Sequence, residues 1–163
     1  MEQWSKRSIE VAYLLNPAFC ASLVYLAIKE YSKKISHGLP FSLIYLILPI
    51  LLHKTTRDDI NSKTNMVKWL QNRPELLIGF SKRVNSLLDY TNETIEFLLS
   101  HEIVKIVGDK FQIINNLSPT LINVNAEKNR EMKDCYLKAE HLGRWFANMK
   151  SQENIYIAWG IKP

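Results

Sequence analysis

Residues 16–38, NPAFCASLVYLAIKEYSKKISHG, decide the fold class of this chain. Asn16 can accept hydrogen bonds from the free amides of a helix, and Pro17 suits the first helical position, where its missing N–H costs no hydrogen bond. The apolar side chains that follow recur at helical spacing and cover nearly all faces, which is typical of a helix surrounded by protein. Gly38 is a natural stop for the segment. The stretch therefore predicts a buried helix.

The next segment, residues 39–52, reads LPFSLIYLILPILL and is the most hydrophobic part of the chain. Its fourteen residues are too few for a membrane span, which needs about 18 or more, so we expect a buried core helix. Pro40 should start this helix, and Pro49 should kink or end it, because the proline ring displaces the carbonyl group of Tyr45. Residues 55–65 are polar and predict a connection.

Further helices and a hairpin follow in the predicted order. Residues 66–71 form a short helix, Pro74 begins a longer one with an apolar stripe, and Thr91 caps the next. The spacing of apolar residues then changes from that of a helix to that of a strand. Residues 104–107 and 110–114 predict two short strands around a Gly-Asp turn. Helices followed by such a hairpin outline a winged helix.

These elements predict an α+β fold that is mainly helical, in a single domain of residues 1–163. The N-terminal helices occupy residues 16–53, the winged-helix-like part about 66–115, and a C-terminal helix and strand about 126–163. The strand is predicted from the terminal IYIAWGIKP and could join the hairpin. Length and composition agree, because 163 residues with 47% hydrophobic and 23% charged side chains are typical of one globular domain.

Basic side chains gather in one part of the chain. The formal net charge is +5, and residues 54–88 alone carry seven basic and three acidic side chains. Such a segment is either an ordinary solvated helix face or a surface for phosphate or an acidic partner. Its candidate DNA-contact residues are Lys54, Arg57, Lys68, Arg73, Lys82 and Arg83.

The sequence contains no recognisable catalytic or cofactor motif. Its four histidines form no metal-binding pair at the usual spacing, and every glycine is isolated, so the phosphate-binding loops of nucleotide enzymes are missing. Cys20 lies in an apolar setting that should raise the pKa of its thiol and leave it inert, and Cys135 lies in a similar pattern. We therefore expect no enzyme, no metal and no cofactor. Two such cysteines, and an N-terminus without an apolar signal region, favour the cytoplasm.

Residues 142–147, LGRWFA, stand out within a predicted helix. A glycine inside a helix costs about 1 kcal/mol relative to alanine, so Gly143 predicts the close approach of another backbone. Arg144 and Trp145 belong to the residue types most enriched at binding hot spots. The segment is therefore either a partner-binding surface or a packing contact with the first helix.

Several motifs resemble one known family, in the same order along the chain. They are LLNPAFC at residues 14–20, GLP at 38–40, LGRWFA at 142–147 and GIKP at 160–163. They resemble the middle component of bacterial three-component ABC systems, a group that includes the C subunit of Lamassu anti-phage systems. The resemblance implies a small non-enzymatic subunit that works with an SMC-like ABC ATPase and a nuclease-like effector, and that meets DNA through the complex and no membrane.

By analogy with accessory subunits of related SMC complexes, such a subunit would bind the ATPase heads and couple DNA sensing to control of the effector nuclease. The two most distinctive motifs supply the partner-binding candidates, which are Asn16, Pro17, Phe19, Gly143, Arg144, Trp145 and Phe146.

A stand-alone winged-helix DNA-binding regulator is the alternative, with the helix from Thr91 as its recognition helix. Residues 91–102 carry three glutamates and no lysine or arginine. Because an acidic helix reads the major groove poorly, this hypothesis ranks second. An enzyme with a dispersed site ranks third.

Overall fold

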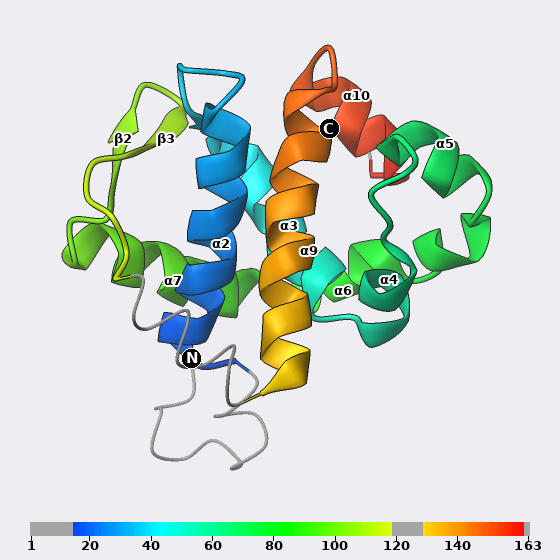
Figure 1. Cartoon of the computed structure of the whole chain (residues 1–163), viewed down its shortest axis with the longest axis horizontal. Helices are drawn as coiled ribbons and strands as arrows, with labels where there is room; N and C mark the ends of the chain where they lie inside the picture. Colours follow the sequence, from blue (N-terminus) through cyan, green and yellow to red (C-terminus); the bar gives the residue numbers. More distant parts are fainter. Residues whose placement is uncertain (1–14, 119–128, 162–163) are drawn as a thin grey trace.

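Two long helices lie side by side at the centre of the molecule (Figure 1). The computed structural model describes residues 15–118 and 129–161. α2 (Pro17–Ser32) is buried on nearly all faces, as its apolar sequence predicts, and α9 (Arg130–Ala147) packs along it. The side chain of Asn16 caps α2 by accepting a 2.8 Å hydrogen bond from the backbone N–H two residues on, which confirms the predicted start.

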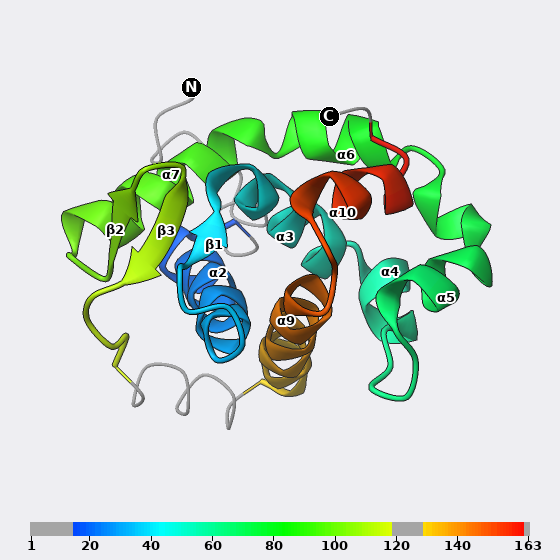
Figure 2. The ribbon, with the colours of Figure 1, turned by 90° about the horizontal axis from the view of Figure 1, so that it is seen from above.

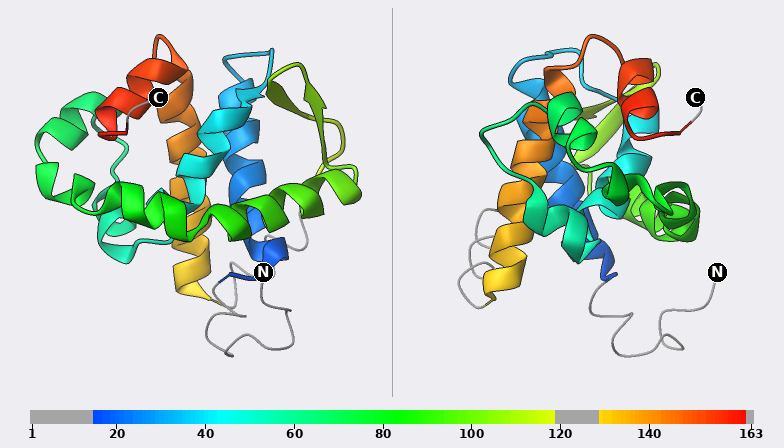
Figure 3. Two further views of the ribbon diagram at one scale, coloured as in Figure 1. Left: turned by 180° about the vertical axis from the view of Figure 1, so that it is seen from behind. Right: turned by 90° about the vertical axis from the view of Figure 1, so that its right-hand side faces the viewer.

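A second layer of helices crosses behind this pair (Figure 3). The 3-10 turn η2 (Phe41–Leu43) leads into α3 (Ile44–Leu51), which is almost wholly buried and ends shortly after Pro49, as expected for a proline inside a helix. α6 (Phe80–Ser86) and α7 (Leu88–Ser100) follow one another across the back of the molecule.

Short elements flank α9 on the side away from α2 (Figure 2). They are α4 (Lys54–Asp59), α5 (Met66–Gln71), the 3-10 turn η3 (Pro74–Leu77) and α10 (Gln152–Ala158). α5 and α10 are neighbours although they are far apart in the sequence, and the buried Trp159 after α10 packs near the ring of Phe80, at 4.5 Å between centroids.

A small antiparallel sheet covers the other side of α2 (Figure 1). Its order is β1 (Leu39–Pro40), β3 (Lys110–Ile113) and β2 (Val104–Val107). β2 and β3 form the predicted hairpin, in which Val107 pairs with Lys110 across the Gly-Asp turn. The mainly helical α+β class is therefore confirmed, whereas these contacts do not establish a winged helix.

The predicted C-terminal strand is wrong, because its residues form the helix α10 and β1 takes the place beside the hairpin. Ser151 caps α10 by accepting a hydrogen bond of 3.3 Å from the N–H of Asn154. Ile155 and Trp159, one helical turn apart, are the buried anchors of this segment. Over so short a stretch, the spacing of the apolar residues fits both the two-residue period of a strand and the 3.6-residue period of a helix. The burial of Ile155 together with Trp159 favours the helix.

Several boundaries also differ from prediction. Pro40 lies in β1 and precedes the 3-10 turn η2 instead of starting the core helix, and Pro74 begins the 3-10 turn η3 rather than a long helix, since α6 starts only at Phe80. Residues 55–65 contain most of α4 instead of a plain connection. Thr91 lies inside α7 rather than at its start, and its hydroxyl donates to the carbonyl oxygen of Leu87 at 2.9 Å. The start of the C-terminal helix predicted near residue 126, and the last two residues of the GIKP motif, lie outside the described residues. Within residues 15–118 and 129–161, no helix is both long and apolar enough to cross a bilayer.

Candidate partner interface

The LGRWFA segment lies in the interior, at the contact between α9 and α2. A Cβ added to Gly143 would lie 2.3 Å from the carbonyl oxygen of Ala27, so only glycine permits this approach of the two helices. Trp145 and Phe146 are 3% and 1% exposed. The structure therefore confirms packing against the first helix, and it places Gly143, Trp145 and Phe146 where a partner cannot reach them.

Trp145 instead joins α9 to the short elements beside it. Its indole N–H donates to the carbonyl oxygen of Thr64 at 3.0 Å, and its ring centroid lies 4.9 Å from that of Trp69. Trp69 in turn lies 5.9 Å from Trp159, the residue that follows α10. This aromatic cluster holds α5, α9 and α10 together through large buried rings.

Arg144 is the one residue of the Gly-Arg-Trp-Phe run that reaches the surface, with 47% of its side chain exposed. Its Nη1 donates to Oε2 of the buried Glu30 at 2.8 Å, and Lys33 donates to the other oxygen. Burial alone would raise the pKa of Glu30, but the hydrogen bonds and charges of Lys33 and Arg144 outweigh it and hold this pKa below its ordinary value. The contact that the structure shows for Arg144 is therefore its ion pair with the buried carboxylate of Glu30.

The NPAF part of the LLNPAF motif forms the cap and the first residues of α2. Asn16 and Pro17 serve as cap and first helical residue, so their visible roles are structural. Phe19 is half-buried, lies 5.9 Å from the ring of Tyr136, and lines a pocket of about 460 Å³ at this end of the molecule. We call this hollow the basal pocket.

The basal pocket lies between the starts of α2 and α9, the end of α3, and α6. Most of its wall is apolar, and it also brings together Phe19, Arg57 and Arg83 from the two groups of predicted residues. Its remaining lining residues are Leu15, Pro49, Leu52, His53, Ser86, Leu87, Asn129, Glu131, Met132 and Cys135. A concave apolar surface with a few polar groups is the usual form of a binding site.

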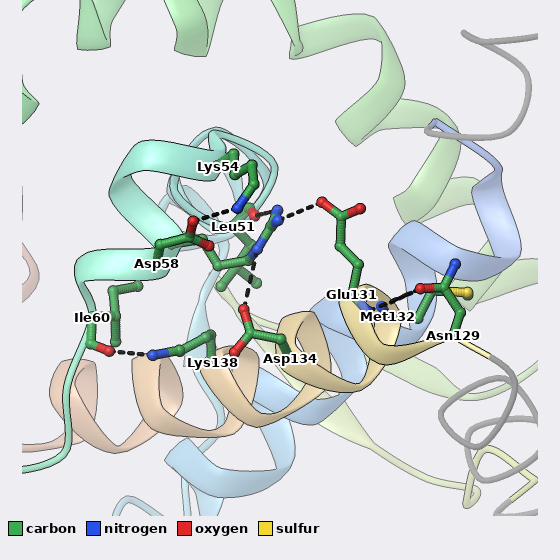
Figure 4. A network of polar contacts seen from close by, with 10 residues as sticks. Leu51, Lys54, Asp58, Ile60, Asn129, Glu131, Met132, Asp134 and Lys138 are labelled. Atoms are coloured by element: carbon green, nitrogen blue, oxygen red, sulfur yellow. Dashed lines mark hydrogen bonds and ion pairs between the residues drawn. The ribbon is translucent and has the colours of Figure 1, made fainter.

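Arg57 lines the basal pocket and is only 4% exposed. Figure 4 shows the network of polar contacts around its partners Leu51, Glu131 and Asp134. The Nη1 of Arg57 donates to the carbonyl oxygen of Leu51 at 2.9 Å, its Nη2 donates to Glu131 at 2.6 Å, and its Nε lies 3.4 Å from a carboxylate oxygen of Asp134. Both carboxylates come from the first turns of α9. The guanidinium group therefore fastens α4 to α9, and it is not available to DNA.

Arg83 is held on the opposite wall without a carboxylate partner in the described part of the chain. It donates to the carbonyl oxygens of Leu76 at 2.8 Å and Ile78 at 3.1 Å, and lies 5.3 Å from the ring centre of Phe80. Burial lowers the pKa of Arg83. Burial and then the charge of Arg83 lower the pKa of His53, so this histidine is neutral at neutral pH.

Both cysteines are buried, and their thiols are mostly protonated at neutral pH. Burial raises the pKa of Cys20 to about 12 and that of Cys135, beside the basal pocket, to about 11. The expected rise for Cys20 is therefore confirmed, and neither thiol is an activated nucleophile at neutral pH.

Most of the predicted DNA-contact residues are engaged within the protein. Lys54 pairs with Asp58, Arg73 pairs with Asp59 at 3.0 Å, and Arg57 and Arg83 are held as described. Among residues 15–118 and 129–161, the side chains of the other two candidates, Lys68 and Lys82, are exposed and have no ion pair or hydrogen bond.

The residues that sequence reasoning missed are mainly the acidic partners of these cations. Glu131 and Asp134 follow the cap residue Asn129, which accepts from the N–H of Glu131 at 2.9 Å. Asn129 with acids in the next turns is a local signal for a helix start. No local signal links them to Arg57, which lies 74 positions from Glu131.

The fold and the basal pocket define a small, mainly helical protein with an apolar surface pocket. Over residues 4–163 the chain matches the family model of ABC-three component (ABC-3C) system Middle Component 3. The chain therefore belongs to this family of middle components of three-component ABC systems. No curated protein and no solved structure matches it significantly.

Proposed function

We propose that this chain is a non-catalytic accessory subunit of an SMC-like ABC ATPase complex in anti-phage defence, of the Lamassu kind. In this role it binds the ATPase heads and couples DNA sensing to control of an effector nuclease, in the cytoplasm. The observation that carries the proposal is its membership of the middle-component family over nearly the whole chain.

The basal pocket is the surface that we assign to the ATPase. It is apolar, it is lined by Phe19 of the LLNPAF motif, and it has Arg83 as a cation without a carboxylate partner in the described chain. Such a pocket suits an apolar side chain of a partner next to an acidic group.

DNA contact through the complex fits the charges better than DNA binding by the isolated chain. Four of the six candidate cations are held by groups of the protein itself. Since affinity for DNA depends on the number of phosphates that cations neutralise, the two free lysines among these six candidates contribute little to binding by the chain alone.

The proposal is tested by co-expressing the full chain with the other two components of its system and purifying it through a tag. Wild type should retain the ATPase. Ser86→Trp should reduce this association, because Ser86 lines the basal pocket and an indole there fills it from the side.

Ser100→Trp is the matched control. Each serine is exposed and donates to the carbonyl oxygen three residues before it, at 2.9 Å for Ser86 and 3.1 Å for Ser100, but Ser100 does not line the basal pocket. Equal retention in both variants would remove the basal pocket from the proposal. No association of the wild type with an ATPase, or nuclease or ATPase turnover by the purified chain alone, would refute the proposed function.

A further inference from the structure

A second groove lies at the opposite end of α9 from the basal pocket. It consists of two adjoining hollows, of about 630 and 540 Å³, which share Val67 and Gln71 of α5 with Asn148 and Met149 after α9. We call it the α5–α10 groove, since α5 forms one wall and α10 the other (Figure 2). It shares no lining residue with the basal pocket.

The groove is lined by one of the two most exposed large apolar side chains of the described residues. Ile157 on α10 lines it and is 65% exposed, and Ile78, which is 75% exposed, is the next residue in the chain after the lining residue Leu77. Val67 is a further aliphatic lining residue, on the wall formed by α5. Exposed aliphatic groups clustered along one groove are typical of a protein-binding surface.

The charges on the groove all have one sign. Lys68 and Lys150 line it, no aspartate or glutamate does, and neither lysine forms an ion pair with another described residue. A complementary occupant therefore carries carboxylates beside aliphatic side chains. Single-stranded nucleic acid fits less well, because bases stack on exposed aromatic rings and the exposed lining here is aliphatic.

We infer that the α5–α10 groove binds an acidic segment with aliphatic side chains from a second component of the same system. This inference rests on the proposed function and adds the chemistry of the second partner. Met132 at the basal pocket and Trp145 at the groove both belong to α9. At 1.5 Å per residue they lie about 20 Å apart along the helix, so one subunit can hold two partners at once.

The first test uses the full chain co-expressed with the other two components, and substitutions of exposed groove residues. Ile157→Ser and Lys68→Glu should each weaken retention of one component about tenfold, the effect of losing an interface side chain that contributes more than about 1 kcal/mol. The matched controls are Leu137→Ser, a 54% exposed leucine on α9, and Lys105→Glu, an exposed lysine on β2, and both should leave retention unchanged. Urea midpoints and helix content establish that all variants fold.

The second test identifies the occupant. The photo-reactive residue p-benzoylphenylalanine replaces Ile157, or Leu137 as control, and the irradiated complex is digested and analysed by mass spectrometry. The expected product joins position 157 to a peptide of another component that is rich in aspartate or glutamate.

The outcomes separate this inference from the proposed function. If wild type retains its partners and the groove variants retain them equally, the groove inference is overturned and the proposed function stands. A cross-link to nucleic acid, or to a peptide without acidic residues, also overturns the groove inference. If wild type retains neither component, the proposed function fails and this inference fails with it.

Discussion

The Gly143→Ala substitution should destabilise the protein, although alanine is the better helix former. The new Cβ would lie 2.3 Å from the carbonyl oxygen and 3.0 Å from the carbonyl carbon of Ala27. Ordinary van der Waals contact begins near 3.4 Å, so α2 and α9 must separate by about 1 Å. Overpacking of a core costs about 1–3 kcal/mol, and the gain in helix propensity returns only about 1 kcal/mol.

The difference is about 0–2 kcal/mol, and we expect a net loss at its upper end, about 2 kcal/mol, because the clash is with backbone and no rotamer change relieves it. For a chain of this size such a loss lowers Tm by about 4–8 °C. Urea unfolding followed by tryptophan fluorescence measures the change in midpoint at constant m-value.

Ala27→Gly serves as the control variant. The three atoms nearest the added Cβ are the oxygen, carbonyl carbon and Cα of Ala27, which are all backbone. Ala27→Gly removes only a Cβ that is not among these atoms, so the double variant should be no more stable than Gly143→Ala alone. Stability of Gly143→Ala equal to or above that of wild type would refute the assigned approach of the two helices.

Three further predictions concern the polar groups of the core and its surface. Arg57→Met should lower unfolding stability by about 2 kcal/mol through the loss of charged hydrogen bonds, and Glu131→Gln should cost less because a second carboxylate remains, which urea titration of both variants checks. Because the pKa of Glu30 is lowered in the folded state, its contribution is complete above its usual value of 4.5 and is lost as pH falls through the lower folded value. Glu30→Gln should therefore flatten the fall in urea midpoint below pH 4.5, and an unchanged slope would contradict the assignment. Cys20 and Cys135 should react with a thiol reagent at about pH 8 more than 100-fold more slowly in the native than in the unfolded chain, since few thiolates form; rapid native labelling would contradict their burial.

The parts of the fold that the sequence predicts are those with a local physical cause. Asn16 and Pro17 begin α2 because capping and a fixed φ act over neighbouring residues. The Gly-Asp turn joins the hairpin for the same kind of reason. The C-terminal strand fails as a prediction because Ile155 and Trp159 are drawn into the core by residues distant in the sequence, and the alternating pattern alone favours neither period.

The candidate site is less predictable than the fold, because exposure is a property of the assembled core. Arg and Trp are typical both of interfaces and of tightly packed helix contacts, and only the positions of Thr64 and Trp69 beside α9 show that Trp145 is buried. The same holds for Arg57, whose acidic partners lie more than seventy positions away. Net charge in a segment counts its cations but does not show which of them are neutralised within the fold.

The burial of LGRWFA gives that motif an indirect part in the proposed binding. α9 is fixed near its start by the ion pairs of Arg57, and towards its end by the close approach of Gly143 to α2 and by the ring cluster of Trp145. A helix held near both ends keeps the basal pocket and the α5–α10 groove at a constant separation. A displacement imposed at one end must then move the other end with it, since packed interiors deform little. Rigid transmission of this kind requires a tightly packed α9 and no reactive group, which is why the interior position of the motif supports a coupling role.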